Sequence, residues 1–133
     1  MLIKEIMRNK IVTIDSNATI FDACNKYRNY EVGCLLVTDN DQIVGIVTER
    51  DVIERTICME RNPKTTKIKE IMSLDIKTVN PLDKVEKAID IFKRYKIKRL
   101  PVISNDKLVG IVTLTDIAYK KYGIREFIEQ WKS

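Results

Sequence analysis

The sequence predicts an α+β domain made of two tandem copies of one half-domain, each in the order helix, strand, helix, strand, strand, helix. Residues 3–57 align with residues 68–122 at a constant shift of 65 positions, and 19 of the 55 pairs are identical. Self-similarity at a fixed period indicates a repeat architecture. Each half alone is too short to bury a full core, so we expect the copies to pair about a pseudo-twofold axis as one globular unit.

The repeats suggest a simple division of the chain. The expected parts are repeat 1 (residues 1–60), a connector (61–66), repeat 2 (67–122) and a C-terminal helical extension (123–133). Gly123 breaks the last helix of repeat 2, and Phe127 and Trp131 lie four residues apart after it. This spacing predicts a short amphipathic helix that docks on the body of the protein or on another subunit.

The elements of the two copies are expected at equivalent positions. Each copy starts with a helical lead-in, continues with a short β-branched strand and a helix, and ends with a hairpin and a last helix. In repeat 1 these are residues 3–7, 11–14, a helix with Ile20, Ala23, Cys24 and Tyr27 on one face, 32–38, 43–48 and 51–58. In repeat 2 they are residues 68–72, 76–79, a helix with Val85, Ala88, Ile89 and Phe92 on one face, 97–103, 108–113 and 116–122.

Composition excludes several classes of function. The chain has no histidine, which removes the commonest general base, the Ser/His and Cys/His nucleophile pairs and most zinc sites. Its three cysteines have no metal-binding spacing, so we expect small apolar core residues in a reducing cytoplasm. No apolar run approaches the roughly 18 residues of a membrane span, and the first residues do not resemble a signal peptide. We therefore expect a cytoplasmic protein that is not an enzyme.

The net charge of +5 is shared unevenly between the halves. Residues 1–60 hold 7 Lys and Arg against 10 Asp and Glu, whereas residues 61–133 hold 17 against 9. A positive patch attracts phosphate groups, whether on a nucleotide or on a nucleic acid. Solvated side chains on a helix face explain Lys93, Arg94 and Lys96 equally well.

One phrase, Gly-Ile-Val-Thr-x-x-Asp, ends both copies at residues 45–51 and 110–116. Thr48 and Thr113 follow an apolar strand and precede a helix, so each can cap that helix with the acid three residues later. The same geometry suits a ligand, because a helix N-terminus favours phosphate and a carboxylate can accept hydrogen bonds from a ribose diol. The retention of Gly, Thr and Asp in both copies favours ligand contact.

These motifs resemble a tandem pair of CBS domains, also called a Bateman module. The resemblance covers roughly residues 3–122 and rests on the lead-in Ile-Lys-Glu-Ile-Met, the strand Arg99-Leu-Pro-Val and the duplicated phrase. It implies a stand-alone regulatory module that senses energy or metabolite levels by binding AMP, ADP, ATP or S-adenosylmethionine between the repeats. It also implies a homodimer and a regulated enzyme or transporter as partner, with no cofactor beyond the regulatory ligand.

The resemblance assigns ligand-binding residues to two clefts. By this likeness the motif aspartate holds the ribose hydroxyls, and the nearby threonine contacts ribose or phosphate. One cleft would use Thr113, Thr115 and Asp116 with Ala18, Ala23, Gly33 and Cys34. The other would use Thr48, Arg50 and Asp51 with Asp83, Ala88, Lys98 and Arg99.

The two copies differ at positions that matter for these assignments. Pro101 corresponds to Leu36, Arg99 corresponds to Cys34, and Asp83 stands where a small or hydroxyl residue is usual in the family. Asp83 also begins a possible capping box that ends at Glu86. For Arg50, a position on the exposed face of a helix competes with a phosphate contact. We expect two unequal clefts.

Nucleic-acid binding through the basic second repeat is the alternative function. Tyr95 is the only aromatic residue close to the Lys/Arg cluster, and no RNA-binding signature is present. Adenosine-ligand binding is therefore the favoured hypothesis.

Overall fold

The computed structural model describes residues 1–123, and these fall into two units. Unit 1 combines residues 1–10 with the chain from residue 77 onward, and unit 2 is formed by residues 11–76. The units therefore do not coincide with the sequence repeats, because each lead-in belongs to the unit that holds the body of the other repeat. The C-terminal helix expected around Phe127 and Trp131 lies outside the described residues.

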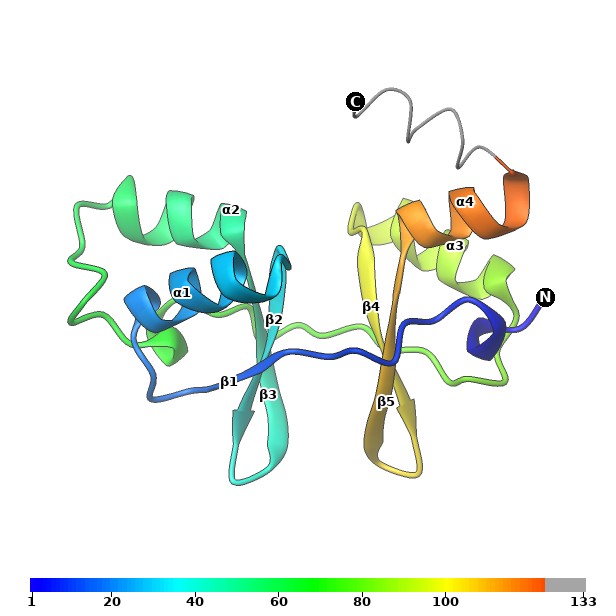
Figure 1. The fold of residues 1–133 in the computed structure, drawn as a ribbon, viewed down its shortest axis with the longest axis horizontal. Coiled ribbons are helices and arrows are strands. Elements are labelled where there is room, and N and C mark those ends of the chain that lie inside the picture. The colour runs from blue at the N-terminus through cyan, green and yellow to red at the C-terminus, as the bar shows by residue number, and fades with distance from the viewer. Residues whose placement is uncertain (124–133) are drawn as a thin grey trace. The chain divides into compact units, whose positions relative to one another are not determined.

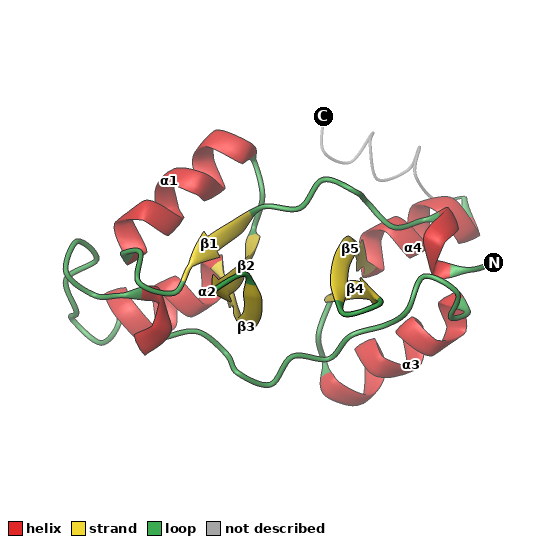
Figure 2. Cartoon of the chain, turned by 90° about the horizontal axis from the view of Figure 1, so that it is seen from below, coloured by secondary structure: helices red, strands yellow, loops and turns green. Residues whose placement is uncertain are grey.

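Unit 2 is built on a three-stranded sheet in the order β1-β2-β3 (Figures 1 and 2). Strand β1 runs parallel to β2, and β2 runs antiparallel to β3. The elements are β1 (Thr13–Asp15), α1 (Ile20–Tyr30), β2 (Cys34–Asp39), β3 (Gln42–Thr48), α2 (Glu49–Val52), the π-helical turn η2 (Ile53–Ile57) and the 3-10 turn η3 (Ile68–Glu70).

The core of unit 2 joins α1 to the sheet and to the lead-in of repeat 2. Ile20, Ala23 and Tyr27 bury one face of α1, as the helical spacing predicted. Ile68 and Ile71 from the lead-in pack in the same cluster. The apolar spacing of the lead-in therefore serves this core, whose other half comes from repeat 1.

Unit 1 is built on a two-stranded antiparallel sheet, β4-β5. Residues of the first lead-in complete its core, where Ile3 and Ile6 pack with Val85 and Phe92 of the first helix of repeat 2. Figure 1 shows this dark-blue lead-in beside the two helices of the unit. The elements are the 3-10 turn η1 (Ile3–Glu5), α3 (Val85–Tyr95), β4 (Arg99–Ser104), β5 (Lys107–Thr113) and α4 (Leu114–Tyr122).

The strand expected at residues 76–79 is wrong, because only an isolated parallel bridge between Val79 and Val102 forms there. In unit 2 the equivalent strand is extended by a bond from the Leu36 amide to the Val12 carbonyl. The residue equivalent to Leu36 is Pro101, which has no N–H to donate. Proline therefore shortens the ladder in the second copy.

The two hairpins agree with the sequence prediction. Each turns through two residues, Asn40-Asp41 and Asn105-Asp106, and all four have positive φ. A two-residue turn of this kind matches the right-handed twist of the strands it joins, and Asn and Asp tolerate positive φ better than most residues.

Two smaller expectations need correction. Cys24 and Cys58 are exposed and only Cys34 is buried, so the cysteines are not uniformly core residues. The expected capping box from Asp83 is also absent: α3 begins after Lys84, which makes no side-chain cap, and Asp83 accepts from the Asn80 amide in the preceding turn.

Candidate functional site

The duplicated phrase forms the same backbone corner in both units, at the junction of a strand and a helix. Thr48 and Thr113 are the N-cap residues, and their hydroxyls accept from the amides of Asp51 and Asp116 at 3.2 and 3.0 Å. The threonine cap is therefore confirmed in both copies, whereas the acid completes a reciprocal capping box at Asp51 and is bonded to Arg8 at Asp116. A cap of this type stabilises the helix start by roughly 0.5–2 kcal/mol.

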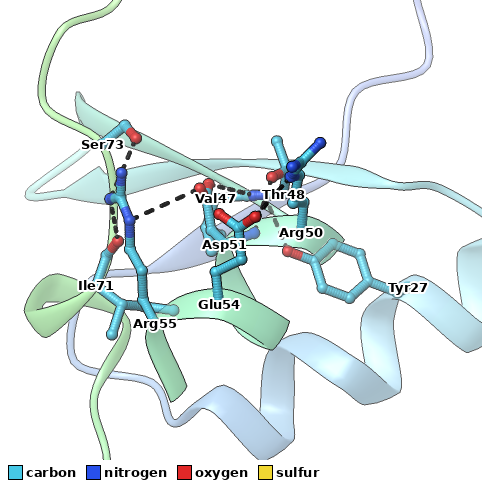
Figure 3. Close-up of polar contacts among 9 residues, drawn as sticks. All are labelled: Tyr27, Val47, Thr48, Arg50, Asp51, Glu54, Arg55, Ile71 and Ser73. Atoms are coloured by element: carbon cyan, nitrogen blue, oxygen red, sulfur yellow. Dashed lines mark hydrogen bonds and ion pairs between the residues drawn. The ribbon is translucent and has the colours of Figure 1, made fainter. Parts of the chain in front are cut away.

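At the Asp51 corner, which we define as Thr48, Asp51 and Arg55, the acid is held chiefly by its own backbone. Asp51 Oδ2 accepts from the Thr48 amide at 2.9 Å, which completes a reciprocal capping box (Figure 3). Arg55 Nε lies 4.0 Å from Asp51 Oδ1, while Arg55 Nη1 donates to the Ile71 carbonyl at 2.9 Å. The side chain of Asp51 remains 17% exposed.

Tyr27 contacts the end of β3 that leads into the Asp51 corner. Its buried hydroxyl donates to the carbonyl of Val47 at 2.9 Å, directly before the Thr48 cap (Figure 3). Burial is the largest cause of a strongly raised pKa for this phenol, and nearby Cys34 and Asp51 add to it. The hydroxyl therefore stays protonated as a donor that fixes the end of β3. Phe92, the equivalent residue in unit 1, has no such group.

At the Asp116 corner, which we define as Arg8, Thr113 and Asp116, the acid is held by the arginine that directly follows the lead-in. Arg8 Nε donates to both carboxylate oxygens, at 3.0 and 2.9 Å, and Arg8 Nη2 donates to Oδ1 at 2.7 Å. The Asp116 side chain is 4% exposed, whereas that of Arg8 is 59% exposed. The hydrogen bond to Asp116 is the largest cause of the raised pKa of Arg8, partly offset by burial.

The helices also tie the two lead-ins down by equivalent bonds. Lys120 Nζ donates to the Ile6 carbonyl at 3.4 Å, as Arg55 does to the equivalent Ile71 carbonyl. Tyr119 adds a smaller electrostatic contribution to the raised pKa of Arg8, and its buried hydroxyl has no hydrogen-bond partner among the described residues. The positive group near the motif aspartate thus differs between the units. In unit 2 it is Arg55, four residues after Asp51, and in unit 1 it is Arg8, from the start of the chain.

Four other residues of unit 2 were assigned to ligand binding, and two of them lie at the Asp51 corner. Cys34 pairs with Thr48 across the sheet, and the Gly33 carbonyl accepts from the Glu49 amide, so both lie at the corner. Ala23 is fully buried in the core. Ala18 precedes α1 in a turn, with its carbonyl bonded to the Ile68 amide.

Arg50 lies on the exposed face of α2, where it pairs with Glu54 at 2.7 Å (Figure 3). Its side chain is 83% exposed, so the interpretation as a surface helix residue fits this position. The pair with Glu54 is the largest cause of a raised pKa for Arg50.

In unit 1 the predicted residues separate into two places. Arg99 starts β4 and pairs with Thr113, and the carbonyl of the preceding Lys98 accepts from the Leu114 amide, so both basic residues lie beside the corner. Thr115 is exposed in the first turn of α4, and Ala88 is fully buried in the core. Asp83 lies away from the Asp116 corner, near the turn of the β4–β5 hairpin.

Asp83 lines a polar hollow of about 400 Å³ beside the turn of the β4–β5 hairpin. Lys87 lies 3.2 Å from its carboxylate, and the pKa of Asp83 is lowered mainly by the Asn80 amide and further by Lys87. Thr113 and Asp116 do not line this hollow, which is bounded by Thr78, Val79, Asn80, Asp83, Lys87, Ile103, Asn105 and Asp106.

Sequence reasoning missed Arg8, Arg55 and Tyr27 as parts of the corners. The available signal was the difference between copies: Arg8 aligns with Ser73, and Arg55 aligns with Lys120. Each corner has one arginine near the aspartate, but at different positions.

Two further features of residues 1–123 bear on the class of site. No helix in that range combines the length and apolar character needed to cross a bilayer. The same residues bring no three His, Cys, Asp or Glu side chains together as a metal-ligand set.

Comparisons with known proteins address the resemblance directly. The model of the CBS domain family matches residues 3–57 and 68–122. The CBS domain-containing protein YhcV of Bacillus subtilis is 32% identical over 116 residues, which are 87% of this chain and 82% of that protein.

Solved structures agree with the sequence comparisons. The hexameric CBS-CP12 protein from bloom-forming cyanobacteria is 33% identical, with a TM-score of 0.82, covering 98% of this chain and 79% of that one. The CBS domain pair of protein MJ0100, in complex with 5′-methylthioadenosine and S-adenosyl-L-methionine, is 28% identical with a TM-score of 0.81, covering 92% and 97%. Because the family model matches both repeats and the identity to a full-length relative exceeds 30%, this chain belongs to the CBS domain family as a tandem CBS pair.

Proposed function

We propose that this CBS pair is a regulatory module that binds an adenosine-containing compound, with Asp51 and Asp116 as the acceptors for ribose hydroxyls. The observation that carries the proposal is the duplicated corner, where a capped helix start and a carboxylate follow the same strand. Such a corner offers hydrogen-bond acceptors for a diol and backbone amides for a phosphate. The similar pair of MJ0100, crystallised with two adenosine compounds, supports the ligand class.

The proposed residue sets follow the resemblance to the family. In the first set, Thr113, Thr115 and Asp116 act with Ala18, Ala23, Gly33 and Cys34. In the second set, Thr48, Arg50 and Asp51 act with Asp83, Ala88, Lys98 and Arg99. Backbone groups dominate the contributions of Gly33, Ala18 and Ala23, because these residues carry little or no side-chain chemistry.

Occupancy has to be passed to a partner for regulation. We propose self-association as the first step, with a regulated enzyme or transporter as the final target, and the hexameric CBS-CP12 relative supports self-association. A ligand shifts such an equilibrium only by its differential affinity for the two arrangements, typically by about 1–3 kcal/mol of coupling.

Isothermal titration calorimetry with AMP, ATP, S-adenosylmethionine and 5′-methylthioadenosine tests the proposal. We expect saturable binding to the wild-type chain and the loss of one binding event in each of Asp51→Asn and Asp116→Asn. Asparagine at position 51 keeps a side-chain acceptor for the Thr48 amide but lacks the charge, and the α4 cap does not use the Asp116 carboxylate, so both helices stay capped. Absence of heat and of thermal shift with all four compounds at millimolar concentration would refute adenosine binding.

A further inference from the structure

We infer that Arg8 competes with ligand for the carboxylate of Asp116, and so makes the Asp116 site the weaker of the two. The inference rests on the proposed function, because it assigns a control to the same site. Arg8 directly follows the lead-in, outside the predicted ligand sets, and nothing in the duplicated phrase points to it.

The geometry at Asp116 leaves little of the acid available. Three hydrogen bonds from one guanidinium engage both carboxylate oxygens, at 2.7 to 3.0 Å. Charge-assisted bonds from a planar guanidinium to a carboxylate are among the strongest in proteins. With 4% of the Asp116 side chain exposed, a ribose diol has to displace Arg8 or share the carboxylate with it.

The Arg8 side chain can leave without unfolding the lead-in. Its backbone is fixed by two bonds to Ile111, at 2.8 and 2.9 Å, and the preceding Ile3 and Ile6 are buried in the core. The side chain itself is 59% exposed, so most of it faces solvent. Release of Asp116 therefore requires a change of side-chain rotamer rather than of backbone.

The Asp51 corner lacks this competition. Ser73 occupies the position equivalent to Arg8, and its hydroxyl accepts from Arg55 at 3.4 Å. Arg55 approaches the acid only to 4.0 Å and donates instead to the Ile71 carbonyl. The structure thus assigns the stronger ribose acceptor to Asp51.

Titration in an Asp51→Asn background isolates the Asp116 site. We expect Arg8→Gln to tighten binding of 5′-methylthioadenosine and of AMP by about tenfold, which corresponds to about 1.4 kcal/mol. Both compounds carry the ribose diol, and only AMP carries a phosphate. Equal tightening therefore indicates competition for Asp116. Unchanged affinity, or weaker binding of AMP alone, would overturn the inference, the latter because Arg8 would then contact the phosphate.

Two further variants control for folding and charge. Arg8→Lys keeps the charge but cannot form the bidentate pair, so we expect tightening between wild type and Arg8→Gln. Lys10→Gln changes the same net charge nearby on an exposed residue and should leave affinity unchanged. Tightening by Lys10→Gln equal to that by Arg8→Gln would reduce the effect to general electrostatics and overturn the inference.

The reverse construction moves the contact to unit 2. In an Asp116→Asn background, the double substitution S73R and R55K gives the Asp51 corner the arrangement of unit 1, and we expect about tenfold weaker 5′-methylthioadenosine binding. Unaltered binding would count against the inference while leaving adenosine binding intact. If no variant and no wild-type chain binds any adenosine compound, both the inference and the proposed function are wrong.

Discussion

The Asp51 corner and the Asp116 corner begin with the same helix cap, yet the arginine near each aspartate comes from a different part of the chain. Arg55 lies four residues after Asp51, in the π-helical turn η2 that follows α2, whereas Arg8 is 108 residues from Asp116. The first acid therefore depends mainly on local structure, and the second depends on Arg8, which follows the lead-in of the other repeat. Duplicated backbone geometry does not imply duplicated electrostatics.

The largest difference is expected on removing each arginine. Arg8→Ala leaves the buried Asp116 carboxylate without its counter-charge, and we expect a loss of roughly 2–3 kcal/mol in the free energy of unfolding. This is less than for a fully buried pair, because water reaches the exposed guanidinium. Arg55→Ala should cost only about 0.5–1 kcal/mol, since Asp51 keeps its cap. Urea unfolding at pH 7 measures both.

A double-mutant cycle sharpens this first comparison. Arg8→Ala in an Asp116→Asn background should cost much less than in the wild-type chain, because the charge that Arg8 neutralises is gone. Equal costs in the two backgrounds would mean that Arg8 stabilises unit 1 through packing alone.

The motif glycines allow a second comparison, based on close packing against the lead-ins. A Cβ at Gly110 would lie 2.9 Å from both the Arg8 carbonyl oxygen and the Met7 Sδ, whereas at Gly45 it would lie 2.6 Å from the Met72 Sδ and 3.0 Å from the Ser73 carbonyl oxygen. Backbone moves less easily than a methionine side chain, and the two backbone contacts are nearly equal. We therefore expect Gly110→Ala and Gly45→Ala to cost similar amounts, about 1–2 kcal/mol each, measured by thermal unfolding. A clearly larger loss at Gly45 would show that Met72 cannot repack.

Local sequence patterns predicted part of the fold but not all of it. The repeat, the hairpins and the Thr caps follow from local patterns, and all three were predicted. The packing of each lead-in in the core of the other repeat was not predicted, because Ile3 and Ile68 have the same apolar spacing whichever core they enter. The missing strand at Val79 depends on Pro101, a residue whose effect is visible only once its pairing partner is known.

For the candidate site, the prediction reached the aspartates but not the side chains that hold or support their corners, Arg8, Arg55 and Tyr27. Thr48 and Asp51 are close in sequence, so a motif can reveal their contact. The contact between Arg8 and Asp116 joins opposite ends of the chain, and the residue equivalent to Arg8 in the other copy is the uncharged Ser73. The retained glycines have a packing explanation and the threonines a capping one, so the aspartates carry most of the remaining functional signal.

A third comparison concerns the support of each corner by α1 or α3. Tyr27→Phe makes unit 2 resemble unit 1, which has Phe92, and removes a buried hydrogen bond. We expect a loss of about 1 kcal/mol at pH 8. The folded pKa of Tyr27 is raised, so the unfolded chain releases this proton first, near pH 10, and wild-type stability falls as pH rises above that.

The stability gap between wild type and Tyr27→Phe should therefore shrink from pH 8 to pH 11, since the variant lacks this titration. Chemical unfolding at the two pH values provides the measurement. Tyr30→Phe, at an exposed position on the same helix, is the matched control and should show no such convergence. A gap that stays constant would mean that the Tyr27 phenol ionises equally in the folded and unfolded chains.

The smallest effect on stability is expected at Arg50, whose equivalent in the other corner is Thr115. Arg50 and Glu54 form an exposed pair one helical turn apart, and such pairs contribute little to folding. Arg50→Gln should leave the urea midpoint unchanged. If Arg50 contacts phosphate at the Asp51 site, the same variant weakens ATP binding in an Asp116→Asn background and spares 5′-methylthioadenosine, which has no phosphate. Equal affinities for ATP before and after the change would leave Arg50 as a surface residue whose partner is Glu54.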